Sequence, residues 1–156
     1  RRYPGTGIDP AMNATIEQVC WDTHAARLYA IRHAVFVVEQ QVPESLERDE
    51  HDAGALHLLA SIPGTGDVGT ARMLGNGHIG RMAVLPAWRG RGIGSALLQR
   101  MITVAGERGL HQVRLHAQCR AEGFYRQFGF VPEGEVFVDA GIDHRCMRLR
   151  LDGQPG

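Results

Sequence analysis

The stretch WRGRGIGSALL, residues 88–98, decides how the rest of the chain is interpreted. Three glycines, Gly90, Gly92 and Gly94, stand at the start of a segment whose apolar residues recur at helical spacing. A glycine in a helix interior costs about 1 kcal/mol relative to alanine. We therefore expect that a backbone without side chains is needed at these positions, even though glycine lowers helix stability there.

A strand that leads into a helix through glycines is typical of an anion-binding site. The first amides of a helix have no partner within it, and the helix dipole adds about half a positive charge at that end. Arg89 and Arg91 flank the glycines and add counter-charge. The stretch therefore predicts a bound phosphate, in particular a pyrophosphate; the alternative is a glycine-rich tight turn without a ligand.

Three phosphate-binding motifs compete for this stretch. A P-loop needs a Gly-Lys-Ser/Thr sequence, and the stretch contains no lysine. A dinucleotide fingerprint needs G-x-G-x-x-G, which the spacing of these glycines does not match. The third motif, R/Q-x-x-G-x-G/A, is met by residues 89–94. This motif resembles the pyrophosphate loop of the GNAT superfamily of acetyl-CoA-dependent N-acetyltransferases.

The resemblance extends over most of the chain, from about residue 15 to 150. MAVLPAWRGRGIGSALL, residues 82–98, is similar to the GNAT strand–loop–helix unit, and AEGFYRQFGF, residues 121–130, is similar to its second unit. Three further segments resemble the ElaA-like branch more narrowly: IRHAVFVVEQQ at 31–41, HLLA at 57–60 and GEVFVDAGIDHRCM at 134–147. That branch is poorly defined in substrate, so the closer match narrows the fold more than the chemistry.

Hydrophobic periodicity predicts an α/β (α+β) domain in the order β-α-β-β-β-α-β-α-β-β. The expected strands are 14–20, 56–62, 67–74, 78–85, 112–118, 130–138 and 143–151, and the expected helices are 23–36, 92–106 and 121–128. Asp22 is a candidate N-cap for the first helix. The first helix should bury Leu28, Ile31, Val35 and Phe36, and the second Ile93, Ala96, Leu97, Met101 and Val104.

The GNAT resemblance implies a central, mostly antiparallel, splayed sheet of about seven strands flanked by helices. The strands at 78–84 and 112–118 would pair at one end and part at the other. Acetyl-CoA, the expected co-substrate, would lie in the opening between them.

Length and composition exclude several other classes. The chain has 156 residues and equal numbers of basic and acidic residues, so a general nucleic-acid binder is not expected. No apolar run approaches a membrane span or a secretion signal. We expect one domain over residues 13–152, preceded by a disordered leader or cloning remnant at 1–12 with a native start at Met12.

The cysteines and histidines point to a reducing compartment and to no metal site. The three cysteines, Cys20, Cys119 and Cys146, form no C-x-x-C pair, so a cytoplasmic protein without a disulfide framework is expected. The eight histidines show no H-x-x-x-H or H-E-x-x-H pattern, so no metal is expected.

The resemblance also implies which residues hold the co-substrate. Backbone groups of Met82, Ala83 and Val84 would hold the pantetheine and the acetyl carbonyl. The residues around the pyrophosphate would be Arg89, Gly90, Arg91, Gly92, Ile93, Gly94 and Ser95. Gln118 stands where the family often has Asn, and a longer contact to the pantetheine arm is expected from it. Tyr125 matches the family's usual acid for the leaving thiolate, although it also fits a packing stripe.

The general base is left open between two residues and a water chain. His78 resembles a histidine that some amine acetylases use on the corresponding strand; otherwise it is a hairpin-end residue facing solvent. Glu39 follows an apolar run, and partial burial would raise its pKa toward a base role; otherwise it is a helix-end ion-pair residue. His57 and His116 are expected to be satisfied sheet histidines rather than catalysts.

The polar stretch at 44–52 has two interpretations. Four of its acidic residues, Glu47, Asp49, Glu50 and Asp52, could line an entrance for a cationic amine, with Arg48 offsetting part of their charge. Otherwise the stretch is a solvated loop, which is the more frequent case. The turn at 139–144 is expected to border the acceptor pocket.

The main hypothesis is an N-acetyltransferase that acts on a primary amine of a small molecule or peptide. A second hypothesis is an acyl-homoserine-lactone-type acyltransferase, because residues 31–40 also resemble the R-x-x-V-F-V entry of those enzymes. A third is a non-catalytic acyl-CoA-binding module on the same fold. The amine, the preferred acyl chain and a homodimeric or monomeric state are left open by the sequence.

Overall fold

The computed structural model describes residues 13–47 and 49–152. The leader expected at 1–12 and the expected role of Arg48 lie outside these residues. In chain order the elements are β1 (Thr15–Val19), α1 (Trp21–Arg32), the π-helix η2 (His33–Glu39), α2 (Glu44–Glu47), β2 (Leu56–Ile62), β3 (Gly66–Met73), β4 (His78–Val84), the 3-10 helix η3 (Pro86–Trp88), α3 (Ile93–Glu107), β5 (Gln112–Gln118), the 3-10 helix η4 (Cys119–Ala121), α4 (Glu122–Arg126), β6 (Val131–Asp139) and β7 (Ile142–Arg150).

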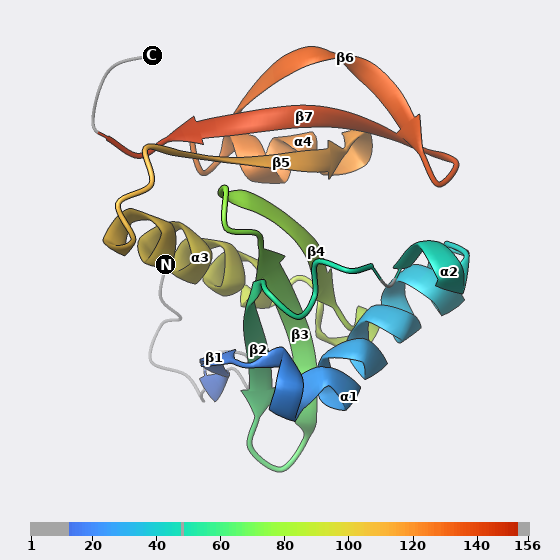
Figure 1. Ribbon diagram of the computed structural model, residues 1–156. Helices are drawn as coiled ribbons and strands as arrows, with labels where there is room; N and C mark the ends of the chain where they lie inside the picture. The colour runs from blue at the N-terminus through green and yellow to red at the C-terminus, as the bar shows by residue number, and fades with distance from the viewer. Residues whose placement is uncertain (1–12, 48, 153–156) are drawn as a thin grey trace.

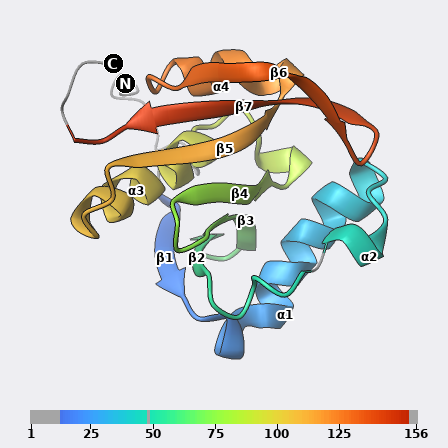
Figure 2. The same cartoon turned by 45° about the horizontal axis from the view of Figure 1, so that its top comes forward.

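The seven strands form one sheet in the order β1-β2-β3-β4-β5-β7-β6. All neighbours are antiparallel except β4 and β5, which are parallel and pair only at His78↔Arg114 and Ile79↔Leu115. Beyond these pairs the two strands part, so that β5, β6 and β7 form an upper layer above β2, β3 and β4 in Figures 1 and 2. The predicted splayed, mostly antiparallel sheet is confirmed.

Helices cover both faces of the central strands. The helix α1 packs Leu28 and Ile31 against Leu59 of β2, whereas α3 packs Leu97 against the opposite face, where Leu58 lies. Neighbouring residues of a strand point to opposite faces, so β2 is buried on both sides, and five of its seven residues are apolar. Among the described residues, no helix is long and apolar enough to cross a membrane.

The start of α1 differs from the sequence-based expectation. The helix begins at Trp21, its N-cap is Cys20, and no side chain caps it, so the prediction that Asp22 is the N-cap is wrong. Asp22 instead lies in the first turn, where its carboxylate faces the positive end of the helix dipole. The predicted stripe is confirmed for Leu28, Ile31 and Val35, which are buried, whereas Phe36 is half-buried and lies with Val35 in the π-helix η2 rather than in α1.

The helix α3 begins as predicted but buries a slightly different face. Its N-cap is Gly92, and the predicted Ile93, Leu97 and Met101 are buried, together with Leu98 and Ala105. Ala96, which was expected on the buried face, is exposed. The helix approaches β3 closely at Gly69, where an added Cβ would lie 3.1 Å from Leu97 and 3.3 Å from Ile93.

Candidate functional site

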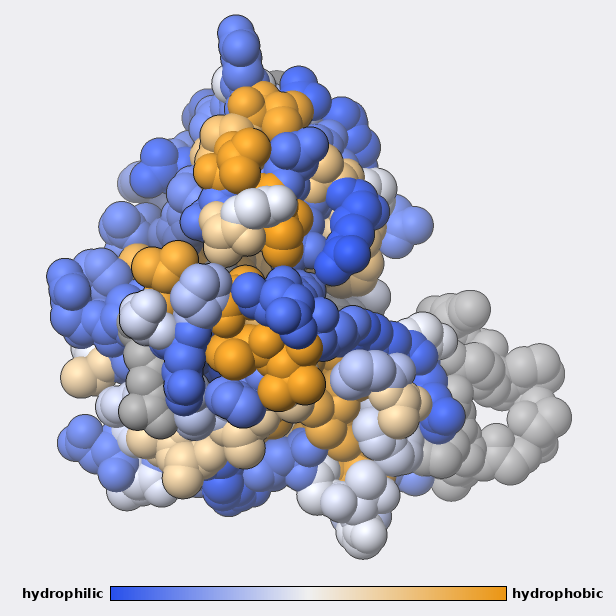
Figure 3. Space-filling model, turned by 90° about the vertical axis from the view of Figure 1, so that its right-hand side faces the viewer, coloured by the Kyte–Doolittle hydropathy of each residue, from blue (hydrophilic) through white to orange (hydrophobic). Residues whose placement is uncertain are grey.

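The parting of β4 and β5 leaves a cavity of about 450 Å³. Figure 3 views the molecule from the side toward which the two strands part and shows apolar side chains in a recess between an upper and a lower part. The cavity is lined by both strands, η2 and α4, and its polar or titratable lining residues include Glu39, Gln40, Arg81, Arg89, His116, Gln118, Arg120 and Tyr125. The opening predicted between these strands therefore exists and is large enough for the arm of a coenzyme.

A β-bulge interrupts β4 inside this cavity. Thr70 and Arg72 of β3 pair with Ala83 and Gly80, so two residues of β4, Arg81 and Met82, stand opposite the single Ala71. Arg81 has a φ of 47°, in the left-handed region that a non-glycine residue rarely adopts. A bulge leaves its extra residue unpaired in the ladder. Backbone polar groups of β4 thus become available at the point where the strands part.

The side chain of Arg81 is anchored to the segment around α2. Its Nε donates to the carbonyl of Glu47 at 3.0 Å, and its Nη2 donates to the carbonyl of Leu46 at 3.3 Å and to Oδ2 of Asp49 at 3.1 Å. These hydrogen bonds hold Arg81 in its strained backbone conformation. Such strain persists only where the surrounding structure fixes the residue in this way.

Arg81 belongs to a larger network of three arginines and three carboxylates. Arg32 donates to Glu47 at 2.5 Å and to Asp52 at 2.8 Å, and Arg72 donates to Asp49 at 2.7 Å and to Asp52 at 3.0 Å. Arg32, Glu47, Asp52 and Arg72 are each 5% exposed or less. Burial alone would raise the pKa of Asp52, but the hydrogen bonds and charges of Arg32 and Arg72 outweigh it, and the pKa is lowered.

This network corrects the interpretation of residues 44–52 as a solvated loop. Glu47 and Asp52 are buried ion-pair partners and Asp49 is half-buried, so only Glu44 and Glu50 of the five acidic residues are exposed. Sequence spacing could not reveal this, because the arginines come from α1, β3 and β4. One feature of the sequence could have indicated buried acidic partners: Arg32 lies on the apolar side of α1, beside Leu28 and Ile31.

The glycine-rich loop has the backbone that an anion site needs. Gly90 and Gly92 have φ values of 77° and 90°, and no atom lies within 4 Å of where a Cβ would stand on either. Gly94 packs in the first turn of α3 beside Phe124 and Val84. Ile93 is buried beneath the turn, and Ser95 follows in its first turn. Thus the free amides at the start of α3 border open space.

The two arginines of this loop are held differently. The guanidinium of Arg91 lies over the ring of Trp88 at 4.7 Å from its centroid. Arg89 donates from Nε to the carbonyl of Val84 and, through both terminal nitrogens, to the carboxylate of Glu39 at 2.7 and 2.6 Å. The hydrogen bond from Arg89 lowers the pKa of Glu39. Burial acts in the expected direction but is outweighed by Arg89, so the expectation of a raised pKa for Glu39 is wrong.

His78 lies at the closed end of the splay and is half-buried rather than facing solvent. Its ring meets the ring of His116 edge-on, with centroids 4.6 Å apart. Burial, with the nearby His116, lowers the pKa of His78 to about 4. His116 lines the cavity, whereas His57 is buried and bonded through Nε2 to the carbonyl of Asp52 at 2.8 Å.

Tyr125 lines the same cavity from α4. Its ring contacts Phe124 and Phe130 edge-on, and no described residue forms a hydrogen bond with its hydroxyl. Burial raises the pKa of Tyr125 to about 12. The hydroxyl is thus a proton donor at any ordinary pH.

Gln118, at the end of β5, bridges the opening. Its Nε2 donates to Oε1 of Gln40 at 2.9 Å, and its Oε1 accepts from Nε of Arg120 at 3.1 Å. Met82, Ala83 and Val84 face it from β4, across the same cavity. The Gln118 side chain and residues 82–84, which are expected to hold a pantetheine arm, therefore line the same cavity.

A second cavity of about 250 Å³ adjoins the first. The two share Phe36, Gln40, Arg81 and Gln118 as lining residues. The second cavity is also lined by Val42, Leu46, Glu47, Asp139, Ala140, Ile142 and His144. In Figures 1 and 2 the β6–β7 turn lies beside α2 and the end of α1, and this cavity lies between them. His144 was not singled out from the sequence.

Known proteins resemble this chain over the whole region that builds the two cavities. A family model described as an acetyltransferase (GNAT) domain matches residues 13–151. YjcF, an uncharacterised N-acetyltransferase of Bacillus subtilis, is 33% identical over 123 residues, covering 76% of this chain and 87% of YjcF. ElaA of Escherichia coli is 33% identical over 130 residues, covering 76% of this chain and 84% of ElaA.

Solved structures show the same architecture. The crystal structure of Escherichia coli ElaA matches with a TM-score of 0.78 at 28% identity, covering 86% of this chain and 98% of that one. An acyl-CoA N-acyltransferase from Pseudomonas aeruginosa matches with a TM-score of 0.76 at 32% identity, covering 86% and 97%. Every lining residue of the two cavities falls within the range of the family match.

Proposed function

Because the chain belongs to the GNAT family of acyl-CoA-dependent acyltransferases, and to its ElaA-like branch, we propose that it transfers the acetyl group of acetyl-CoA to a primary amine. The acceptor would be a small molecule or a peptide amine. The observation that carries this proposal is the cavity at the β4–β5 split, which contains the Arg81 bulge, the Tyr125 hydroxyl and Gly94 of the glycine loop.

The donor would lie along the cavity from the glycine loop to the bulge. Free amides at the start of α3, with Arg91 beside them, would bind the pyrophosphate. Backbone groups of residues 82–84 would pair with the pantetheine arm as an added strand does, and Gln118 would reach the same arm. No group within the described residues is arranged to hold a metal ion, and the proposed reaction uses none.

The chemistry would be direct attack of a neutral amine on the thioester carbonyl. The C–N bond forms, charge builds on the carbonyl oxygen, and backbone N–H groups at the β4 bulge stabilise it. The C–S bond then breaks, and the hydroxyl of Tyr125 gives its proton to the leaving thiolate. The tyrosinate recovers a proton from the nitrogen that has become an amide, so the protons balance.

The geometry favours neither of the two base candidates from the sequence. Glu39 is committed to Arg89, which keeps the carboxylate ionised and weakly basic. His78, with a pKa of about 4, holds a proton poorly at neutral pH, and it is not among the cavity-lining residues. A residue on the acceptor side is required, or else a water chain.

A thiol-release assay tests the proposed function. Purified protein is incubated with acetyl-CoA and a panel of primary amines, free thiol is measured, and acetylated products are identified by mass spectrometry. We expect amine-dependent thiol release and a higher melting temperature with acetyl-CoA. Tight acetyl-CoA binding without thiol release on any amine would favour the non-catalytic module. Turnover only with S-adenosylmethionine and a longer acyl donor would favour the homoserine-lactone reaction.

A further inference from the structure

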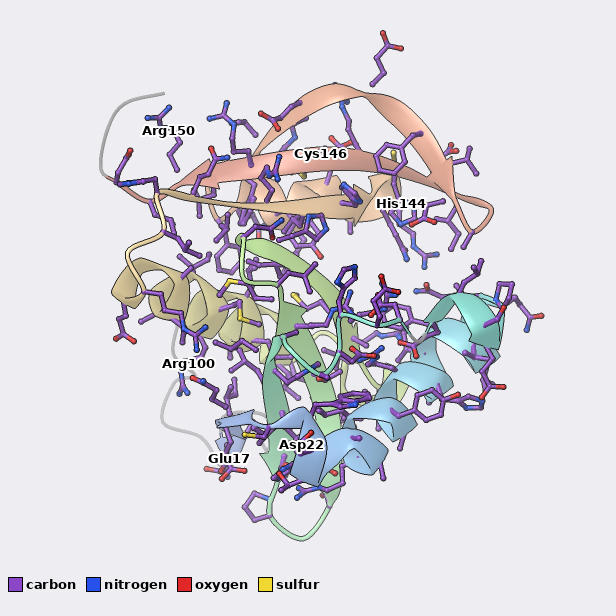
Figure 4. The ribbon with its side chains drawn as sticks, viewed as in Figure 1. Glu17, Asp22, Arg100, His144, Cys146 and Arg150 are labelled. Atoms are coloured by element: carbon purple, nitrogen blue, oxygen red, sulfur yellow. The ribbon has the colours of Figure 1, made fainter. Side chains whose placement is uncertain are left out.

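His144 places an imidazole at the wall of the second cavity. It lies near the start of β7, close to the β6–β7 turn, and points from the upper layer toward the lower one (Figure 4). The other labelled residues of the lower part, Glu17, Asp22 and Arg100, lie far from it. The turn that carries it is a tight one, in which Ala140 and Gly141 both have positive φ values, 52° and 79°.

One hydrogen bond sets which nitrogen of this ring can accept a proton. Nδ1 of His144 lies 2.7 Å from the carbonyl oxygen of Ile142. A carbonyl only accepts, so Nδ1 carries the hydrogen and Nε2 carries the lone pair of the neutral ring. The ring also stacks on Phe137, with centroids 5.9 Å apart and planes 24° from parallel. The bond and the stack together hold the ring in one orientation.

Nε2 is the free polar atom of this side chain. None of the described residues forms a hydrogen bond with it, and His144 lines the cavity that shares Arg81 with the donor site. The charged groups that border this cavity are Glu47, Asp139 and Arg81, and His116 lies beyond Phe137. Arg81 is bound to Asp49 and Glu47 is bound to Arg32, so Asp139 is the one of these three that forms no ion pair with the described residues.

We propose that His144 is the general base that deprotonates the acceptor, and that the second cavity binds the ammonium group of a small amine carrying an apolar group. This inference rests on the proposed function. Phe36, Val42, Leu46 and Ile142 would contact the apolar part. Asp139 would attract the ammonium, and Glu47, whose charge is paired with Arg32, would accept a hydrogen bond from it. One oxygen of Glu47, Oε1, is buried without a hydrogen-bond partner among the described residues.

The proton balance of the step is simple. The lone pair of His144 Nε2 takes one proton from R–NH₃⁺, which leaves R–NH₂ free to attack the thioester carbonyl. The imidazolium is stabilised by its Nδ1–H bond to the Ile142 carbonyl. After the amide and free CoA form, Nε2 releases the proton to solvent. The net reaction therefore yields one proton, as acetylation of an ammonium group must.

The variant His144→Asn tests this role by kinetics. An asparagine amide can still donate to the Ile142 carbonyl but offers no basic nitrogen. With phenethylamine as the acceptor, we expect kcat at pH 7 to fall about 100-fold, the loss to shrink near pH 10, where the amine deprotonates itself, and KM for acetyl-CoA to stay unchanged. His111→Asn, an exposed site between α3 and β5, is the matched control. A loss of equal size at every pH would overturn the base assignment.

A second measurement is independent of turnover. Nitrogen-15 NMR of the histidine rings, assigned with His144→Asn, should show the Nδ1–H tautomer for His144 and a shift of Nε2 when phenethylamine is added. A Nε2–H tautomer, or no shift on adding the amine, would overturn the inference even if the protein acetylates amines. Absence of thiol release in the wild type with every amine would instead overturn the proposed function.

Discussion

The carboxylate of Glu39 and the guanidinium of Arg89 form a two-point ion pair that joins the end of η2 to the first residue of the glycine-rich loop. The same guanidinium donates from Nε to the carbonyl of Val84, at the end of β4. One arginine thus ties together three segments that border the proposed donor site. The pair also means that an incoming phosphate must compete with a carboxylate for Arg89.

Replacement of Glu39 tests that competition. In Glu39→Gln the amide no longer holds Arg89 by charge, so KM for acetyl-CoA should fall by up to about fivefold, the scale of a partly exposed ion pair. The kcat should stay within about twofold, because the carboxylate is not the proposed base. Steady-state kinetics give both values. Glu17→Gln, on β1 away from the cavity, is the control, and a hundredfold loss of kcat would restore Glu39 as the base.

Replacement of Tyr125 tests the acid. Tyr125→Phe should lower kcat about 100-fold and leave KM for acetyl-CoA nearly unchanged, because the ring still packs against Phe124 and Phe130 while the proton donor is lost. Tyr29→Phe, on α1, controls for loss of a phenol outside the cavity. Equal kcat values for Tyr125→Phe and the wild type would remove the acid role.

The pH profile of the wild type carries a related prediction. The pKa of Tyr125 is raised to about 12, so its hydroxyl is protonated below that pH and is lost as an acid only as pH rises through it. Between pH 7 and about pH 10, the kcat profile should show no descending limb from this group. A descending limb near pH 9 that disappears in Tyr125→Phe would contradict the assignment.

The glycine loop can be tested with a pair of variants that share the same backbone strain. Gly92 and Gly109 flank α3 with φ values of 90° and 80°, and both have open space where a Cβ would be added. Gly92→Asp places a carboxylate among the expected phosphate ligands, so KM for acetyl-CoA should rise at least about tenfold. Gly109→Asp should destabilise the protein similarly without that rise in KM. Equal KM values for both variants would dissociate the loop from phosphate binding.

The buried ion network predicts a large effect on stability. In Asp52→Asn, the charge that Arg32 and Arg72 share is removed inside the protein, and the free energy of unfolding should fall by about 3–5 kcal/mol. Asp67→Asn breaks an ion pair with the half-exposed Arg27 and should cost at most about 1 kcal/mol. Urea unfolding at pH 7 measures both.

The same carboxyl predicts a pH dependence of stability. The folded pKa of Asp52 is lowered, so its contribution is present above the unfolded value of about 4 and is lost as pH falls through the folded value. The wild type should therefore lose more stability than Asp52→Asn as the pH is lowered below about 4. Parallel loss in both proteins would show that Asp52 is not ionised in the fold.

The sequence could predict those parts of the protein that local chemistry decides. In strands such as β5, buried and more exposed residues alternate, and this pattern is visible in the sequence. The glycines before α3, which have positive φ values, indicate a backbone without side chains whatever lies around them. The resemblance that these residues carry extended the prediction to the splay between β4 and β5. Asp22 shows the limit of local reasoning, because α1 begins two residues earlier than predicted, at Trp21, whose side chain packs against the core.

Partners far apart in the chain could be decided only by the tertiary structure. Residues 44–52 carry five acidic side chains and look solvated, but arginines of α1, β3 and β4 converge on three of them. Glu39 and Arg89 are 50 residues apart, and their ion pair reverses the expected pKa shift. His144 becomes a candidate base only because the β6–β7 turn is brought beside α2. Periodicity and spacing predict which face of its own helix or strand a residue lies on. The charge state of a side chain depends instead on the groups that the fold packs against it, and these come from distant parts of the sequence.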